Sequence, residues 1–451
     1  MNVLKIPVLF AAMILAAGTP AAFSRDHSPL EDVIESVLTD DCGGESCLSV
    51  ARGFVAFFDR TPAGLKGNGR SCADCHMASD NFQLSPANVE RRYQTLQIFK
   101  RILRRADDPL FRPIDADDFR VNGAAAHDFS NLRENALVRV TIPLPPNIRL
   151  IDPSTNARST ETVADVWRAV PTIEDVRLTG PDDQTPWPRG PNVSGGYQLD
   201  GRKGTLQEQA EGAFTSHAQT VAVPSRRLLD DLAAFQNRVF SSPRVRAFAD
   251  AVATGTSPLP DTDLPLSALE KQGKAVFTRA CTQCHGGPGH STPQAPAVRY
   301  HDISSQCPRP VDTAVPARFN FKPCPQRLAR NARTYEITLP TGATILRVSS
   351  DPGRALLTGF AGVGPPAADD WNKFDVPTLR GIRNTAPYFH NNSAATLEEM
   401  VDHYTEFFKR VQALLPPGTR YPPVISTDGV TVDRPPVPAE IPALLAYLRR
   451  L

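Results

Sequence analysis

Two short motifs in this chain combine a pair of cysteines with a histidine at a fixed spacing. They read Cys72-Ala-Asp-Cys75-His76 and Cys281-Thr-Gln-Cys284-His285. Two thiols three positions apart can add across the vinyl groups on one edge of a porphyrin, and the adjacent imidazole then reaches the iron. A thioredoxin-like redox motif is the alternative for each pair, but that motif has no reason to carry the histidine. The spacing therefore predicts two covalently bound haems c.

The four remaining cysteines have no histidine directly behind them, and they are Cys42, Cys47, Cys307 and Cys324. Their spacing predicts the disulfides Cys42–Cys47 and Cys307–Cys324, which close a short and a medium loop. A metal site built from the four is the alternative. Disulfides are typical of proteins that leave the cytoplasm.

The start of the chain has the features of a secretory signal. Asn2 and Lys5 precede an apolar run over 6–18, and the small residues around Ala22 provide a site where a signal peptidase can cleave the chain. The pattern predicts a signal peptide over 1–24 and a periplasmic mature chain with no integral membrane anchor. An uncleaved anchor is the alternative, although the run is short for a bilayer span.

The composition sets the scale of the fold and excludes some partners. The 451 residues leave room for two or three cores, and 49 basic against 48 acidic residues argue against a nucleic-acid or polybasic membrane role. The 43 prolines indicate long connecting loops between modest helices.

The surroundings of the two motifs match each other, which predicts two related halves. Gly53 and Phe57 precede the first motif, and Gly273 and Phe277 precede the second at the same spacing. The fold class predicted is mainly α, with two cytochrome c-like haem domains, long loops and a large insertion in the first half. The domains are predicted over 25–255, with the insertion at about 80–165, and over 256–451. Within the insertion, the pattern predicts a helix over 87–105 and extended chain over 137–150.

A capping box at Thr396-Leu-Glu-Glu399 predicts a helix from Leu397 to about Leu414. Helical spacing points Tyr404 inward and rotates His403 by about 100°. Tyr404 is the predicted distal ligand of the second haem iron. Met400 is its main competitor and His403 the next, and a core tyrosine bonded to a carbonyl is the structural alternative.

The first half repeats this cap at Thr205-Leu-Gln-Glu208, and the position that corresponds to Tyr404 is Ala213. Alanine cannot ligate iron. The sequence therefore predicts a first haem held by His76 with an open distal face, where peroxide or oxygen can bind, and a second haem held by His285 and Tyr404.

These residues resemble a known family, the bacterial di-haem cytochrome c peroxidases and the related MauG-type enzymes. The similar runs are Val376-Pro-Thr-Leu-Arg-Gly-Ile-Arg-Asn-Thr385-Ala-Pro387-Tyr-Phe-His390 with Ala395-Thr-Leu-Glu-Glu in the second half, and Leu199-Asp-Gly-Arg with Thr205-Leu-Gln-Glu-Gln209 in the first. The position of Tyr404 is a methionine in the peroxidases and a tyrosine in MauG-type enzymes, so this chain sides with MauG.

The resemblance also implies residues over the open haem. Gln209 falls on the family's distal glutamine, whereas Gln219 replaces its acid/base glutamate and Leu199 its inter-haem tryptophan. His217 is the candidate to supply the missing proton transfer, with an ordinary helix-end histidine as the alternative. Trp187 could fill the inter-haem gap or pack in a loop.

The resemblance further implies a calcium ion bound by the carbonyls of Thr385 and Pro387. Ala169 takes the place of the family's asparagine ligand, so a carboxylate or water would have to substitute.

The leading functional prediction is a periplasmic oxidoreductase whose partner is a small cytochrome c, a cupredoxin or a protein substrate. The alternatives are a haem-dependent oxygenase acting on an apolar substrate, similar to the rubber-cleaving oxygenases, and a non-catalytic di-haem electron carrier.

Overall fold

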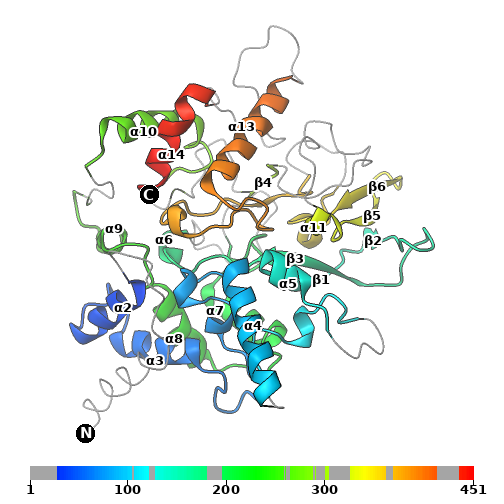
Figure 1. Cartoon of the computed structure of the whole chain (residues 1–451), viewed down its shortest axis with the longest axis horizontal. Coiled ribbons are helices and arrows are strands. Elements are labelled where there is room, and N and C mark those ends of the chain that lie inside the picture. Colours follow the sequence, from blue (N-terminus) through cyan, green and yellow to red (C-terminus); the bar gives the residue numbers. More distant parts are fainter. Residues whose placement is uncertain are drawn as a thin grey trace.

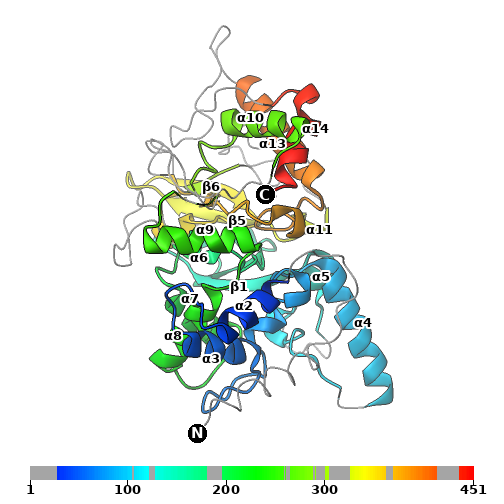
Figure 2. The same cartoon turned by 90° about the vertical axis from the view of Figure 1, so that its left-hand side faces the viewer.

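The structure, a computed structural model of the whole chain, describes residues 28–103, 106–120, 127–179, 196–258, 260, 265–287, 290, 300–303, 326–361, 369–413 and 436–451. Two groups of helices lie at opposite ends of the molecule, with small sheets between them (Figure 1, Figure 2). The predicted signal peptide, Trp187 and the Cys307–Cys324 pair lie outside the described residues.

The first group of helices is built around a close crossing of α3 and α8. Its members are α2 (Pro29–Leu38), α3 (Cys47–Phe58), α7 (Leu206–Ser216), α8 (Arg226–Gln236) and α9 (Pro243–Thr254). A Cβ on Gly53 would lie 1.8 Å from the carbonyl oxygen of Asp231, so only glycine permits this approach. Phe57 packs on Phe235 with ring centroids 5.0 Å apart. The predicted Cys42–Cys47 disulfide is present just before α3.

The second group repeats this crossing with α10 and α14. It contains α10 (Ala268–Ala280), α13 (Leu397–Ala413) and α14 (Ile441–Leu448). A Cβ on Gly273 would lie 1.9 Å from the carbonyl oxygen of Ala443, and Phe277 packs on Tyr447 at 5.4 Å. The repeat that the sequence predicts around Gly53 and Gly273 is therefore confirmed in space, because the same residue types make the same crossing in each group.

The predicted insertion has the regular structure expected of it. The helix predicted over 87–105 is α4 (Pro86–Ile102), and the extended chain forms β1 (Leu137–Pro143) and β2 (Ile148–Leu150). β1 pairs antiparallel with β3 (Val163–Ala169), so that Leu137 lies opposite Ala169. The short helix α5 (Ser130–Asn135) leads into β1.

One strand of the insertion joins the second half of the chain. β2 pairs with β5 (Arg333–Thr338), which pairs with β6 (Thr344–Ser349), all antiparallel. The buried Arg168 makes two hydrogen bonds to Asp351, at 2.6 and 3.0 Å, and also bonds Asp200. The halves thus share a sheet and a buried charge cluster, and the domain bounds 25–255 and 256–451 stay predictions.

The remaining elements are short. They are η1 (Cys72–Asp74), η2 (Ala78–Asp80), η3 (Pro113–Asp115), α6 (Val176–Thr179), β4 (Tyr300–His301), α11 (Gln326–Ala329), α12 (Ala355–Thr358), β7 (Phe374–Asp375), η6 (Ile382–Asn384) and η7 (Pro438–Glu440). The described chain is mainly α with three small sheets. In these ranges, no helix has both the length and the apolar character needed to cross a bilayer.

Candidate functional site

The first cysteine motif folds so that the Nδ1 nitrogen of its histidine is fixed by a backbone carbonyl. His76 N–H donates to the carbonyl of Cys72 at 2.9 Å, which closes the motif into a tight turn over η1. The ring nitrogen Nδ1 lies 3.0 Å from the carbonyl oxygen of Phe82. Because a carbonyl only accepts, Nδ1 carries the proton and Nε2 keeps its lone pair. Burial lowers the pKa of His76, which favours the neutral imidazole that iron binds.

The second motif has the same geometry. His285 N–H donates to the carbonyl of Cys281 at 2.8 Å, and its Nδ1 lies 3.0 Å from the carbonyl oxygen of His290. All four motif cysteines are free thiols. The residues at both positions therefore fit a covalently attached haem c, with paired thiols for attachment and a histidine whose Nδ1 is held by a backbone carbonyl.

The first motif is also held by two arginines that sequence reasoning missed. Asp74, inside the motif, accepts hydrogen bonds from Arg60 at 2.7 and 3.1 Å and from Arg92 at 3.0 Å. Arg92 belongs to α4, so the insertion helix is fixed directly to the attachment turn. These contacts join residues up to 18 positions apart, and no local sequence pattern indicates them.

The two predicted helix caps are present, with one shared difference from the prediction. Thr205 and Thr396 each accept a hydrogen bond from the backbone N–H three residues on, at 3.1 and 3.2 Å. The carboxylates of Glu208 and Glu399 reach the N–H of the residue before the threonine rather than that of the threonine itself. The repeated detail supports the equivalence of α7 and α13, and hence that of Ala213 and Tyr404.

Tyr404 lies beside the second motif. It packs in the same cluster of apolar side chains as Cys281, with its ring 6.0 Å from that of Phe389. Burial raises the pKa of its hydroxyl, and the nearby Cys284 and Cys281 thiols add to the shift. Within the described ranges, no hydrogen bond engages this hydroxyl, whereas the core-tyrosine alternative requires one to a carbonyl.

The two competitors of Tyr404 are both buried nearby. Met400 is a buried member of the apolar core. His403 places Nε2 2.8 Å from the carbonyl oxygen of Ile303, and its ring lies 4.6 Å from Phe389. His403 is thus buried, and more deeply than Tyr404, because the segment at 300–303 covers that side of α13. The sequence pattern alone did not predict this cover.

The structure brings His217 close to the first motif. The helix α7 ends at Ser216, and His217 is its C-cap, so the predicted helical face stops one residue short of it. Burial lowers the pKa of His217 to about 4, while Asp115 raises it and Arg70, Arg202 and His76 lower it. A neutral imidazole therefore lies within electrostatic range of His76.

The other residues predicted to lie over the first haem are Gln219, Gln209 and Leu199. Gln219 is exposed, with a φ of 51°, and its Oε1 accepts a hydrogen bond from Asn68 at 3.1 Å. Gln209 is half-buried on the first turn of α7. Leu199 is half-buried, and its carbonyl accepts from the N–H of Asp375 at 2.8 Å, so it joins the two halves through its backbone.

A segment just before the first motif holds the turn that carries His217 and Gln219. Asn68 N–H donates to the carbonyl of Ala218 at 2.8 Å, and its side-chain amide donates to the carbonyl of His217 at 2.9 Å. A Cβ on Gly67 would lie 2.6 Å from the Ala218 carbonyl oxygen, so this approach too depends on glycine. The distal turn is thereby fixed relative to the attachment turn.

Arg70 extends this clamp into the insertion. Its buried guanidinium donates to the Asp115 carboxylate at 2.5 Å and to the carbonyls of Pro109 and Leu110 at 3.0 and 2.8 Å. The residues 109–115 therefore wrap around the start of the first motif and bring the Asp115 charge near His217.

The predicted calcium position is only partly matched. Thr385 and Pro387 lie in the turn after η6, but Ala169 has no side-chain ligand and its N–H donates to the carbonyl of His390 at 2.7 Å. Two side-chain amides donate hydrogen bonds to the neighbouring backbone carbonyls: Asn81 to the carbonyl of Asn384, and Gln83 to the carbonyl of Ala386 at 2.6 Å. These amide N–H groups act as donors here, but each side chain also carries a carbonyl oxygen of the kind that calcium binds. The calcium ion therefore stays a prediction, and no step is derived through it.

The repeated helix crossing and the repeated histidine geometry define a chain with two equivalent Cys-x-x-Cys-His sites. No family model matches the chain. Over 155 residues it is 30% identical to the cytochrome-c peroxidase IdrP2 of Denitromonas iodatirespirans, and the match covers 34% of this chain and 36% of that protein. The predicted resemblance to the cytochrome c peroxidases is therefore confirmed, and the match spans about a third of the length of this curated relative.

Solved structures with similar folds include a MauG-like protein associated with microbial copper homeostasis, with a TM-score of 0.41 and 19% identity. That match covers 91% of this chain and 90% of the other. The diheme peroxidase BthA from Burkholderia thailandensis has a TM-score of 0.39 and 17% identity, over 90% of this chain and 86% of the other. At these TM-scores neither structure decides the fold.

Proposed function

We propose that the chain is a periplasmic di-haem c oxidoreductase of the cytochrome c peroxidase and MauG type, with peroxide or oxygen as its oxidant. One observation carries this proposal. The equivalent helices α7 and α13 hold Ala213 and Tyr404 at the same position, so the two sites are built alike and differ in the residue that can close the distal face. An open site beside a capped one favours catalysis over the non-catalytic carrier, which needs both irons saturated.

When bound, the haem supplies the iron at which the oxygen–oxygen bond of peroxide is reductively cleaved. Reduction of one hydrogen peroxide to two waters consumes two electrons and two protons. His217, neutral above about pH 4, takes a proton from one peroxide oxygen and returns it to the other. Asn68 and Arg70 keep the turn of His217 fixed to the first motif during this transfer.

The electrons come from a redox partner, which we propose to be a small cytochrome c, a cupredoxin or an oxidisable protein substrate. His285 and Tyr404 would hold the second haem, where a phenolate ligand would favour the oxidised states of the iron. An oxygenase acting on an apolar substrate shares the open first site, and stable oxygen binding by the isolated ferrous protein distinguishes it from the peroxidase.

Two haems should be found on one chain, and they should differ in spin state. Mass spectrometry of protein matured in a haem c-competent periplasm is expected to show two haem additions and loss of residues 1–24. Electron paramagnetic resonance of the ferric protein is expected to show one high-spin and one low-spin signal. A single haem addition contradicts the duplicated site, and two low-spin signals support the electron carrier.

The clamp before the first motif can be tested by Asn68→Ala. Loss of the bonds to the His217 carbonyl and the Gln219 side chain is expected to slow the reaction with hydrogen peroxide about tenfold and to broaden the high-spin signal. Asn147→Ala is the matched control, because it removes a 2.9 Å amide–carbonyl bond to Gly359 in the sheet region. Equal rate losses in both variants would show a general loss of stability instead of a positioning role.

A further inference from the structure

The C-terminal end of α4 exposes an apolar cluster that the proposed function does not use. Its members are Ile98, Phe99, Ile102 and Leu103, with exposed fractions of 56%, 48%, 70% and 57%. Together they expose on the order of 400 Å² of mostly apolar surface, the size at which a surface patch is often functional. Figure 2 shows α4 projecting from the body of the molecule toward this end.

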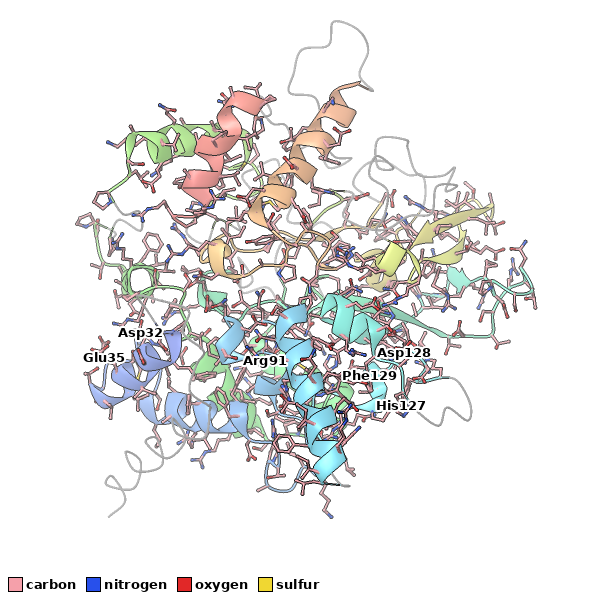
Figure 3. The ribbon with its side chains drawn as sticks, in the orientation of Figure 1. Asp32, Glu35, Arg91, His127, Asp128 and Phe129 are labelled. Carbon is pink, nitrogen blue, oxygen red and sulfur yellow. A yellow bond between two sulfur atoms is a disulfide. The ribbon has the colours of Figure 1, made fainter. Side chains whose placement is uncertain are left out.

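The cluster belongs to the last turn of α4, beyond Leu96, its last buried residue. The buried residues of α4 include Val89 and Leu96, which pack in the core of the insertion. Ile98 and Ile102 lie seven and eleven positions after Arg91, which Figure 3 shows on this helix, so the three share one face. This cluster therefore projects outward from the insertion, which gives the insertion a surface of its own.

Two cations accompany the cluster without a partner of their own. Lys100 and Arg101 are exposed and flank the apolar residues on the last turn, and over the described ranges no carboxylate lies within ion-pair distance of either. The neighbouring arginine pairs, by contrast, are satisfied: Arg133 bonds Glu90 and Arg92 bonds Asp108. An unpaired cation beside exposed apolar groups is complementary to a surface that is negative outside and apolar within.

Two other occupants fit less well. A second copy of this chain, docked through the same cluster, would bring Lys100 and Arg101 against their own like charges. An electron-donating protein bound at this cluster would lie far from the first motif. Arg92 of α4 contacts that motif, and Ile102 lies ten residues, or about 15 Å, further along the helix.

We infer that the end of α4 inserts into an anionic phospholipid surface. The four apolar side chains enter the boundary between headgroups and acyl chains, and Lys100 and Arg101 contact the lipid phosphates. This binding uses insertion of a small tip, so it is compatible with the near-zero net charge that argues against a polybasic membrane role.

The test is co-sedimentation of the holoprotein with phospholipid vesicles. Vesicles of phosphatidylethanolamine and phosphatidylglycerol, at about three to one, are compared with vesicles of phosphatidylcholine alone. Binding is expected to be at least tenfold stronger on the anionic vesicles. The pair Ile98→Ser and Ile102→Ser, and separately the pair Lys100→Glu and Arg101→Glu, are each expected to reduce that binding at least tenfold. The haem spectra and thermal unfolding of both should match those of the parent.

The matched control is the pair Val221→Ser and Val223→Ser, two exposed valines away from α4, which should bind as the parent does. Three results would each overturn the inference: no binding of the parent to anionic vesicles, binding unaffected by both α4 pairs, or an equal loss in the valine control. Sedimentation velocity adds a fourth, because self-association abolished by the isoleucine pair, without vesicle binding, would assign the cluster to a second copy of the chain.

Discussion

His217→Ala is expected to slow the reaction of the ferric protein with hydrogen peroxide by about 100- to 10,000-fold, the usual contribution of a positioned acid or base. The residue is a half-buried imidazole that interacts electrostatically with His76, and Gln219 stands where the resembled family has its glutamate. Stopped-flow absorbance measures the rate constant, and the resting haem spectra should stay unchanged.

The pH dependence of the same reaction follows from the direction of the pKa shift. Because burial lowers the pKa of His217 to about 4, the imidazole is neutral at pH 7 and becomes protonated only as the pH falls through about 4. A neutral imidazole can accept a proton and a protonated one cannot. The rate should therefore hold from pH 7 to about pH 5 and then fall in the parent, with no such fall in His217→Ala.

Two further variants separate His217 from the alternatives. His127→Ala removes an exposed histidine 3.2 Å from Asp118 and should leave the rate unchanged. The sequence alone predicts a marked gain from Gln219→Glu, but Gln219 is exposed and bonded to Asn68, so we expect little change. A large gain would place the proton transfer at position 219, and fast peroxide reduction in all three variants would show that the distal pocket is assigned wrongly.

The parts of the site that the sequence predicts are those encoded locally. The turn that links Cys72 to His76, and the caps at Thr205 and Thr396, each involve residues within a few positions of one another. Even there, the exact acceptor differs: each capping glutamate reaches one residue further than the capping box predicts.

What the sequence does not predict depends on contacts between distant segments. The clamp of Asn68 on His217 joins residues 149 positions apart, and the burial of His403 depends on Ile303, 100 positions away. The pairing of β2 with β5 follows no local pattern, because a three-residue strand carries too little periodicity to choose a partner. These contacts form because they are favourable in the packed structure, and the helical or strand periodicity of the sequence does not predict them.

Tyr404→Phe is expected to convert the low-spin signal of the second haem to a high-spin one. The variant removes only the hydroxyl, so the apolar contacts with Phe389 and the Cys281 cluster remain. Without the phenolic oxygen, the iron keeps His285 and loses its distal protein ligand. Electron paramagnetic resonance of the ferric protein measures the change, and the first haem should keep its own signal.

Tyr388→Phe is the matched control, since Tyr388 is a buried tyrosine of the same core whose hydroxyl donates to the carbonyl of Ile382 at 2.9 Å. Losing that bond should cost about 1 kcal/mol of stability and leave both spin states unchanged. An unchanged low-spin signal in Tyr404→Phe would move the ligand to Met400 or His403. His403 already bonds the Ile303 carbonyl, so it could ligate the iron only if the segment at 300–303 moved. If Met400 is the ligand, no such movement is needed, and Met400→Leu would abolish the low-spin signal.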